Sequence, residues 1–230
     1  MAIRVYPNPE PVPAASQLAV LPFLAAVDGF LRAEAKEPGL RLTLHRAMSR
    51  ESQGYLQQLC GYLDDNGVEW RGKVGRTFPV NEGIVGAAYG DSHIWRTKSF
   101  FSKDTIVDVL RKEMKGRVDP ESSEISYLAI PFLGPQSDPV LVLYAACFEL
   151  NFFADNDRIK QIVSMCDGFC KLFDYLQVDN FPNLRNFSLL RGKPTKGNPP
   201  VFTSIQEQVD DINPPRFKNV TSFNYEDAVA

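Results

Sequence analysis

The residues best suited to chemistry in this 230-residue chain lie near position 95. Trp95 and Arg96 are followed closely by Ser99 and Phe100. An aromatic face can stack on a planar ligand, and an arginine offers a fixed fork of donors to phosphate or carboxylate. This group therefore favours a ligand-facing wall. A strand end whose aromatic side chains fill the core beneath an insertion also explains the same residues.

The stretch before Trp95 contains the turn and the helix start that would position this wall. Phe78 and Pro79 predict an extended approach, and Gly83 suits a positive φ angle, which other residues adopt only at a cost. The small residues at positions 86–88 would let a short helix lie close to a sheet. We expect a pocket wall here, although a tight connection alone needs the same residues.

A strand over Ile125–Leu133 supplies the remaining candidates. Its alternation places Tyr127 and Ala129 on one face and Leu128 and Ile130 on the other, and a polar phenol tip favours the tyrosine face as the pocket. Glu82 can accept a ligand donor, but a carboxylate near a helix N-terminus is also explained by the helix dipole. The predicted ligand-binding residues are Phe78, Glu82, Ile84, Trp95, Arg96, Ser99, Phe100, Tyr127 and Ala129.

The sequence indicates neither a catalytic centre nor a metal centre. We find no nucleophile–base pair, no carboxylate pair with acidic neighbours and no phosphate loop. The four cysteines form no CxxC pair, and neither His45 nor His93 lies within metal-motif spacing of a cysteine. We therefore expect buried thiols, no cofactor and no enzymatic activity.

The overall composition is that of an ordinary globular protein. The counts of 25 basic and 28 acidic residues give a net charge of −3, which argues against nucleic-acid binding as the main function. The most apolar N-terminal run, Gln17–Val27, is interrupted by Pro22 and is shorter than the ~20 residues that a membrane span needs. We expect a cytoplasmic protein without a membrane segment.

Hydrophobic periodicity and turn residues divide the chain into elements. Residues 1–15 form a proline-rich lead-in, and a helix is expected from near Pro22 to the stop at 37–39. Ser102 or Asp104 can cap a helix that ends at Gly116, inside a strand-to-strand connection. Strands are expected over Leu40–Arg46, Tyr55–Tyr62, Ile125–Leu133 and Val140–Phe148.

Asp155 is expected to cap a long helix with one apolar stripe that includes both Cys166 and Cys170. The stripe is wide enough to serve dimerisation as well as core packing. From about Asp179 the periodicity fails, and residues 179–230 are predicted to be a largely irregular tail or to lie along a partner. The predicted partner-binding residues are Phe169, Phe173, Phe202, Phe217, Phe223 and Tyr225.

Four motifs in this order resemble the GAF domain. They are the Phe-Pro-Val-Asn-Glu-Gly-Ile-Val-Gly run at 78–86, Ser-Tyr-Leu-Ala-Ile-Pro at 126–131, the strand at 140–143, and Phe153 with Asp155. The resemblance covers roughly Pro22 to Gln177. It implies an α+β domain over 16–178, with a central antiparallel sheet of about six strands flanked by N-terminal and C-terminal helices. A helical insertion over one face would border a ligand pocket.

The GAF resemblance also implies a regulatory sensor of small molecules that often dimerises. Three departures narrow this implication. The Asn-Lys-x-Phe-Asp signature of cyclic-nucleotide binders is absent, the cysteines of free methionine sulfoxide reductases are missing, and no cysteine near His93 could anchor a bilin. Because the sequence carries no kinase, phosphodiesterase, cyclase or helix-turn-helix pattern, any output is expected to pass through a protein partner.

Two functions remain open from the sequence. The first is a non-enzymatic sensory module that binds a small molecule, or has a filled pocket, and signals through a partner or a homodimer. The second is a structural or adaptor subunit with no ligand, which binds partners through its closing helix and its C-terminal tail.

Overall fold

The computed structural model describes residues 12, 14–36, 39–50, 53–63, 70–71, 74–80, 83–113, 124–175 and 204–219. Its centre is a seven-stranded sheet in the order β5-β2-β1-β8-β7-β6-β9, in which all neighbours are antiparallel. The strands are β1 Arg41–Arg50, β2 Gln53–Gln58, β5 Thr77–Pro79, β6 Trp95–Thr97, β7 Ser126–Leu133, β8 Pro139–Cys147 and β9 Gln206–Gln208. The predicted α+β class is confirmed, and β9 supplies the strand beyond the expected six.

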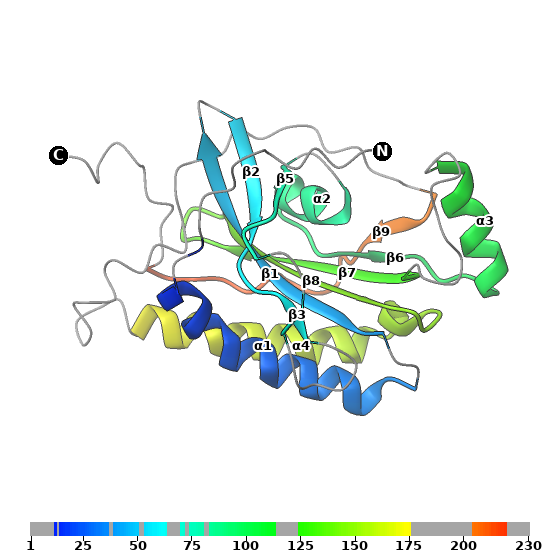
Figure 1. Cartoon of the computed structure of the whole chain (residues 1–230), viewed down its shortest axis with the longest axis horizontal. Helices are drawn as coiled ribbons and strands as arrows, with labels where there is room; N and C mark the ends of the chain where they lie inside the picture. The colour runs from blue at the N-terminus through cyan, green and yellow to red at the C-terminus, as the bar shows by residue number, and fades with distance from the viewer. Residues whose placement is uncertain are drawn as a thin grey trace.

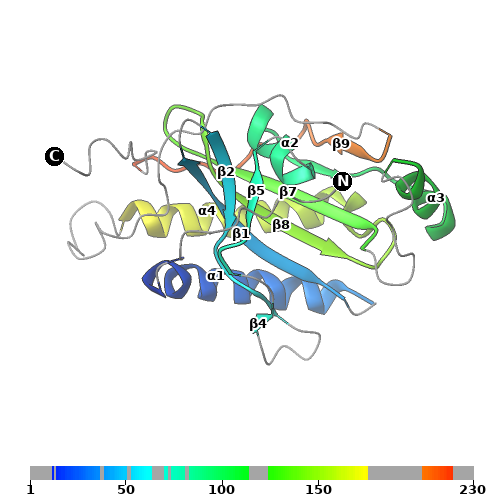
Figure 2. The same cartoon turned by 45° about the horizontal axis from the view of Figure 1, so that its top comes forward.

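Two long helices cover one face of the sheet. Helices α1 (Ala14–Glu34) and α4 (Asn156–Tyr175) lie side by side beneath it in both views (Figure 1 and Figure 2). The main hydrophobic core fills the space between them and the sheet. Asp155 caps α4 as predicted, because its Oδ1 accepts a hydrogen bond from the Asp157 N–H at 2.9 Å.

The first helix begins earlier than the sequence indicated. It starts at Ala14, so Pro22 lies inside α1 rather than in its first turn. A proline cannot donate to the carbonyl four residues before it, but Pro22 is exposed, so water can satisfy that carbonyl. The buried residues Val20, Leu24 and Val27 continue one apolar stripe across the proline.

The opposite face of the sheet carries the short helix α2 (Gly83–Asp91), which Figure 1 places over the strands. Gly83 has φ 63°, as its place in the turn required. The small residues Gly86, Ala87 and Ala88 are buried against the sheet and allow the close approach that the sequence predicted. Helix α3 (Lys103–Glu113) packs on Ile125 and Ile205 at the end of β6.

The returning strand after β1 is shorter than expected. It ends at Gln58, and Tyr62 instead belongs to a separate two-stranded sheet of β3 (Tyr62–Leu63) and β4 (Trp70–Arg71). The backbone N–H of Gln58 donates to the Arg76 carbonyl, and the backbone carbonyl of Gln58 accepts from the Gly75 N–H. The end of β2 is therefore paired with the residues that lead into β5. The remaining element is the 3₁₀ turn η1 (Phe152–Ala154).

Residues 204–219, called the C-terminal segment below, are the described part of the predicted C-terminal tail. They return to the sheet, add β9 to the edge of β6 and bury Phe217 completely. The run Ile-Gln-Glu-Gln-Val at 205–209 does not alternate between apolar and polar residues, because Glu207 stands between Ile205 and Val209, so it gave no strand signal in the sequence. None of the described helices is both long enough and apolar enough to cross a membrane.

Candidate functional site

The sheet face under α2 brings together several of the predicted ligand-binding residues. Ile84, Trp95 and Ala129 are buried in one cluster, with Tyr127 packed against it. Leu128 and Ile130 belong to the core on the α1–α4 side instead, so the predicted face assignment of this strand is confirmed. The shared face follows from the register, in which Trp95 lies opposite Ala129 on the neighbouring strand.

Trp95 is held by protein groups rather than left open to a ligand. Its side chain is buried, and its indole N–H donates to Asp91 Oδ2 at 2.7 Å. Gln208 Nε2 donates to the same oxygen at 2.8 Å. Trp95 is therefore a packing residue that links the end of α2 to β9, which agrees with the second of the two sequence interpretations.

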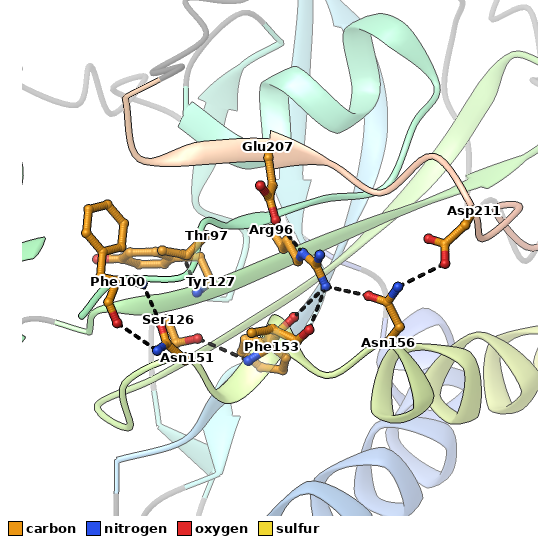
Figure 3. Close-up of polar contacts among 11 residues, drawn as sticks. Arg96, Thr97, Phe100, Ser126, Tyr127, Asn151, Phe153, Asn156, Glu207 and Asp211 are labelled. Atoms are coloured by element: carbon orange, nitrogen blue, oxygen red, sulfur yellow. Dashed lines mark hydrogen bonds and ion pairs between the residues drawn. The ribbon is translucent and has the colours of Figure 1, made fainter. Parts of the chain in front are cut away.

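Arg96 follows Trp95 in β6, so its side chain lies on the other face of the sheet, and Figure 3 shows it pointing toward Asn156. Its Nε lies 2.9 Å from Glu207 Oε1, and its Nη1 donates to Asn156 Oδ1 at 2.6 Å and to the Ala154 carbonyl at 2.9 Å. Asn156 in turn donates to Asp211 at 2.9 Å. This Arg96 cluster joins β6, β9 and the start of α4, and it occupies the guanidinium that the sequence assigned to a ligand.

Ser99 and Phe100 also lie outside the group under α2. The backbone N–H and carbonyl of Phe100 both bond the Asn151 side-chain amide at 2.8 Å (Figure 3). The Phe100 ring packs in the small core with Ile106, while Ser99 is exposed. These contacts fix the start of the α3 connection, and Glu82 lies outside the described residues.

Beside α2, the same face contains a buried polar group that the sequence analysis missed. His45 lies opposite Gln58 in the β1–β2 register, and both side chains are buried. The His45 ring meets Phe78 edge-on with centroids 5.4 Å apart, and Tyr144 at 6.3 Å. The Arg76 guanidinium lies over Phe78 at 4.8 Å. We call His45, Gln58, Arg76, Phe78 and Tyr144 the polar site beside α2.

Three buried polar atoms of this site have no hydrogen-bond partner among the described residues. They are His45 Nδ1, Gln58 Oε1 and Arg76 Nε. Buried polar atoms are nearly always paired, because leaving one unpaired costs about 1–3 kcal/mol. An arginine donor, an amide acceptor and an imidazole nitrogen beside two aromatic faces suit a planar molecule that carries both donors and acceptors.

The charges around the site are set by burial. Burial lowers the pKa of His45 to about 4. A hydrogen bond with the Val142 backbone raises this pKa, and the positive charge of Arg76 lowers it further. The imidazole is therefore neutral at pH 7. Burial raises the pKa of Tyr127 and Tyr144, which keeps both as phenols. Burial also raises the pKa of the nearby Cys60 thiol to about 12, so it is a poor nucleophile.

No group of three or more metal-ligating side chains is present among the described residues.

The predicted partner-binding residues Phe169, Phe173 and Phe217 are buried in the main core, where their rings pack on one another. Within this chain the returning C-terminal segment covers the aromatic end of α4, and partner binding by these residues stays a prediction. Phe202, Phe223 and Tyr225 lie outside the described residues.

No family model matches the chain, and no curated protein matches its sequence. Among solved structures, it is similar to the GAF domain region of a Geobacter sulfurreducens PCA protein, with 16% identity, a TM-score of 0.42 and coverage of 68% of this chain and 95% of that one. It is also similar to a structure described as the GAF domain, with 10% identity, a TM-score of 0.36 and coverage of 68% and 89%.

A third similar structure is an IcIR transcriptional regulator from Alicyclobacillus acidocaldarius, with 16% identity and a TM-score of 0.35. That match covers 67% of this chain and 64% of the regulator. These likenesses concern the fold alone. The α+β class itself is given by the chain's own sheet and helices.

Proposed function

We propose that this chain is a non-enzymatic, GAF-like regulatory module that binds a small molecule at the polar site beside α2 and acts through a protein partner. The observation that carries the proposal is the set of unpartnered buried atoms on His45, Gln58 and Arg76. A ligand that paired with them would remove the cost of their burial, and this gain would contribute to the free energy of binding.

The chemistry of the site narrows the ligand. Neutral His45 and the side-chain amide of Gln58 supply no charge to the site, and Arg76 supplies one positive charge. The aromatic rings of Phe78 and Tyr144 favour a ligand with a flat apolar surface. The ligand class is a planar, neutral or singly anionic molecule with an amide-like donor and acceptor, and turnover is not part of the proposal.

Native mass spectrometry of the protein purified from its own host tests this function. A small mass that is released on denaturation should be lost in His45→Phe, which keeps the ring contacts and removes both ring nitrogens. His93→Phe is the matched control, because His93 is the other histidine and is exposed. Retention of the mass in His45→Phe, or turnover of any substrate by the purified protein, would count against the proposal.

The adaptor function keeps one supporting observation. Leu172 and Tyr175, near the end of α4, are 53% and 62% exposed, which places apolar surface where a partner or a second copy could pack. Under this alternative the purified protein carries no small mass, and Leu172→Glu with Tyr175→Glu abolishes the complex. If the protein is the sensor, those changes leave the ligand bound.

A further inference from the structure

The C-terminal segment is bound to the domain as an extended peptide is bound. Its first contact adds a strand to the sheet edge: the Lys98 N–H donates to the Ile205 carbonyl and the Val209 N–H donates to the Ile94 carbonyl, both at 2.9 Å. A second pair of bonds lies at the end of β7. There Leu133 exchanges hydrogen bonds with the Pro215 carbonyl at 2.9 Å and the Phe217 N–H at 2.8 Å.

Side chains anchor the segment between these backbone contacts. Phe217 is fully buried, stacked on Phe132 with centroids 6.0 Å apart and edge-on to Phe173. The segment places four apolar side chains in the interior: Ile205, Val209, Ile212 and Phe217. It thus has the spaced apolar anchors of a peptide ligand, with Phe217 as the largest.

A carboxylate of the domain binds the end of the segment. The two oxygens of Asp174 accept hydrogen bonds from the N–H groups of Lys218 at 2.7 Å and Asn219 at 2.9 Å. Asp174 is itself buried at the end of α4. Strand addition and a pocket for one side chain are elements by which domains recognise extended peptides, and the Asp174 carboxylate adds two further backbone contacts here.

We propose that residues 204–219 occupy, within their own chain, a peptide-docking groove of this domain, and that a partner protein docks there by displacing them. The groove consists of the β6 edge, the end of β7, the phenylalanine pocket and Asp174. The partner presents an extended segment with apolar residues four apart, followed eight residues later by an aromatic residue, as at 205, 209 and 217.

The contacts of the segment connect the groove to the end of α2. Asp91 Oδ2 bonds both Trp95, which packs under α2, and Gln208 of β9. Displacement of β9 would remove the Gln208 hydrogen bond from Asp91 Oδ2 and leave the Trp95 hydrogen bond in place. The inference names the partner surface of the function proposed above, and it fails separately from ligand binding, because the two use different residues.

The test uses the full chain and a fluorescein-labelled synthetic peptide of residues 204–219. In Phe217→Ala the internal segment is weakened, so the labelled peptide is expected to bind this variant at least ten-fold more tightly than the unmodified chain. A labelled peptide that carries Phe217→Ala should bind the same variant at least ten-fold more weakly. Hydrogen exchange should show faster exchange at 205–219 and unchanged protection of β1, β7 and β8.

A milder variant covers the case in which Phe217→Ala fails to fold. Lys218→Pro removes one N–H that Asp174 accepts and deletes no buried side chain, since Lys218 is exposed. It is expected to raise peptide binding about three-fold or more. The proposal is overturned if both variants lose protection throughout the sheet, because the segment is then integral to the fold. It is equally overturned if residues 205–219 are released and the peptide still does not bind.

Discussion

Two buried polar groups lie on opposite faces of the same sheet, and they differ in how their atoms are paired. In the Arg96 cluster the guanidinium reaches two backbone carbonyls and two side chains. In the polar site beside α2, atoms of His45, Gln58 and Arg76 lack partners among the described residues. A satisfied group stabilises the fold, whereas an unsatisfied group costs stability unless a water, an ion or a ligand pairs with it.

The largest expected effect comes from breaking the satisfied group. Arg96→Met keeps the aliphatic stem but leaves Glu207 and the Ala154 carbonyl without their donor, so we expect a loss of about 3 kcal/mol in the free energy of unfolding. Urea denaturation measures it. Arg41→Met is the matched control, since Arg41 is half exposed and its ion pair with Glu124 should contribute under about 1 kcal/mol. Equal losses in the two variants would remove the distinction.

The pH dependence of the free energy of unfolding tests the polar site beside α2 through His45. His45 has a pKa of about 4 in the folded chain against 6.5 for an ordinary histidine, so between these values only the unfolded chain binds the extra proton. Its contribution is complete above pH 6.5 and is lost as the pH falls toward 4.

We expect the unmodified chain to lose about 2–3 kcal/mol more than His45→Phe between pH 7.5 and 4.5. Urea denaturation at the two pH values gives this difference. Parallel pH profiles for the unmodified chain and His45→Phe would show that His45 is not held neutral by burial.

The smallest expected effect lies at Asp91, where α2 is joined to β9. Asp91→Asn replaces the carboxylate that accepts from both Trp95 and Gln208, and we expect a loss of about 1 kcal/mol. Hydrogen exchange should quicken at Gln208 and Val209 before it changes in β1. Asp157→Asn serves as the control, because that carboxylate lies on the exposed face of α4. Uniform exchange in Asp91→Asn would mean that the carboxylate does not connect α2 to β9.

Much of the fold could be predicted because its signals are local. Alternation identified β1, small residues and Gly83 identified α2, and Asp155 identified the start of α4. The face of Tyr127 also followed from alternation, since a strand repeats every two residues. Pro22 misled because a proline at the start of a helix and one on its exposed side look the same in sequence.

The candidate site could be predicted only in part, because polar groups are paired across long distances in the chain. Arg96 suits a ligand as well as it suits Glu207, which follows 111 positions later. His45 gave no signal beyond its place on the polar side of a predicted strand. Its burial follows from the returning β2 and β5 strands, and those pairings are not visible in any short window of sequence.

The sequence by itself determined the α+β class, the order of elements and which side of most strands is apolar. These properties depend on residues within a few positions of one another. Only the tertiary structure decided that Arg96 is used by the protein, that His45 lies buried beside Gln58, and that residues 204–219 complete the sheet. Each of these depends on which distant atoms meet, and burial then sets the cost of every polar atom left without a partner.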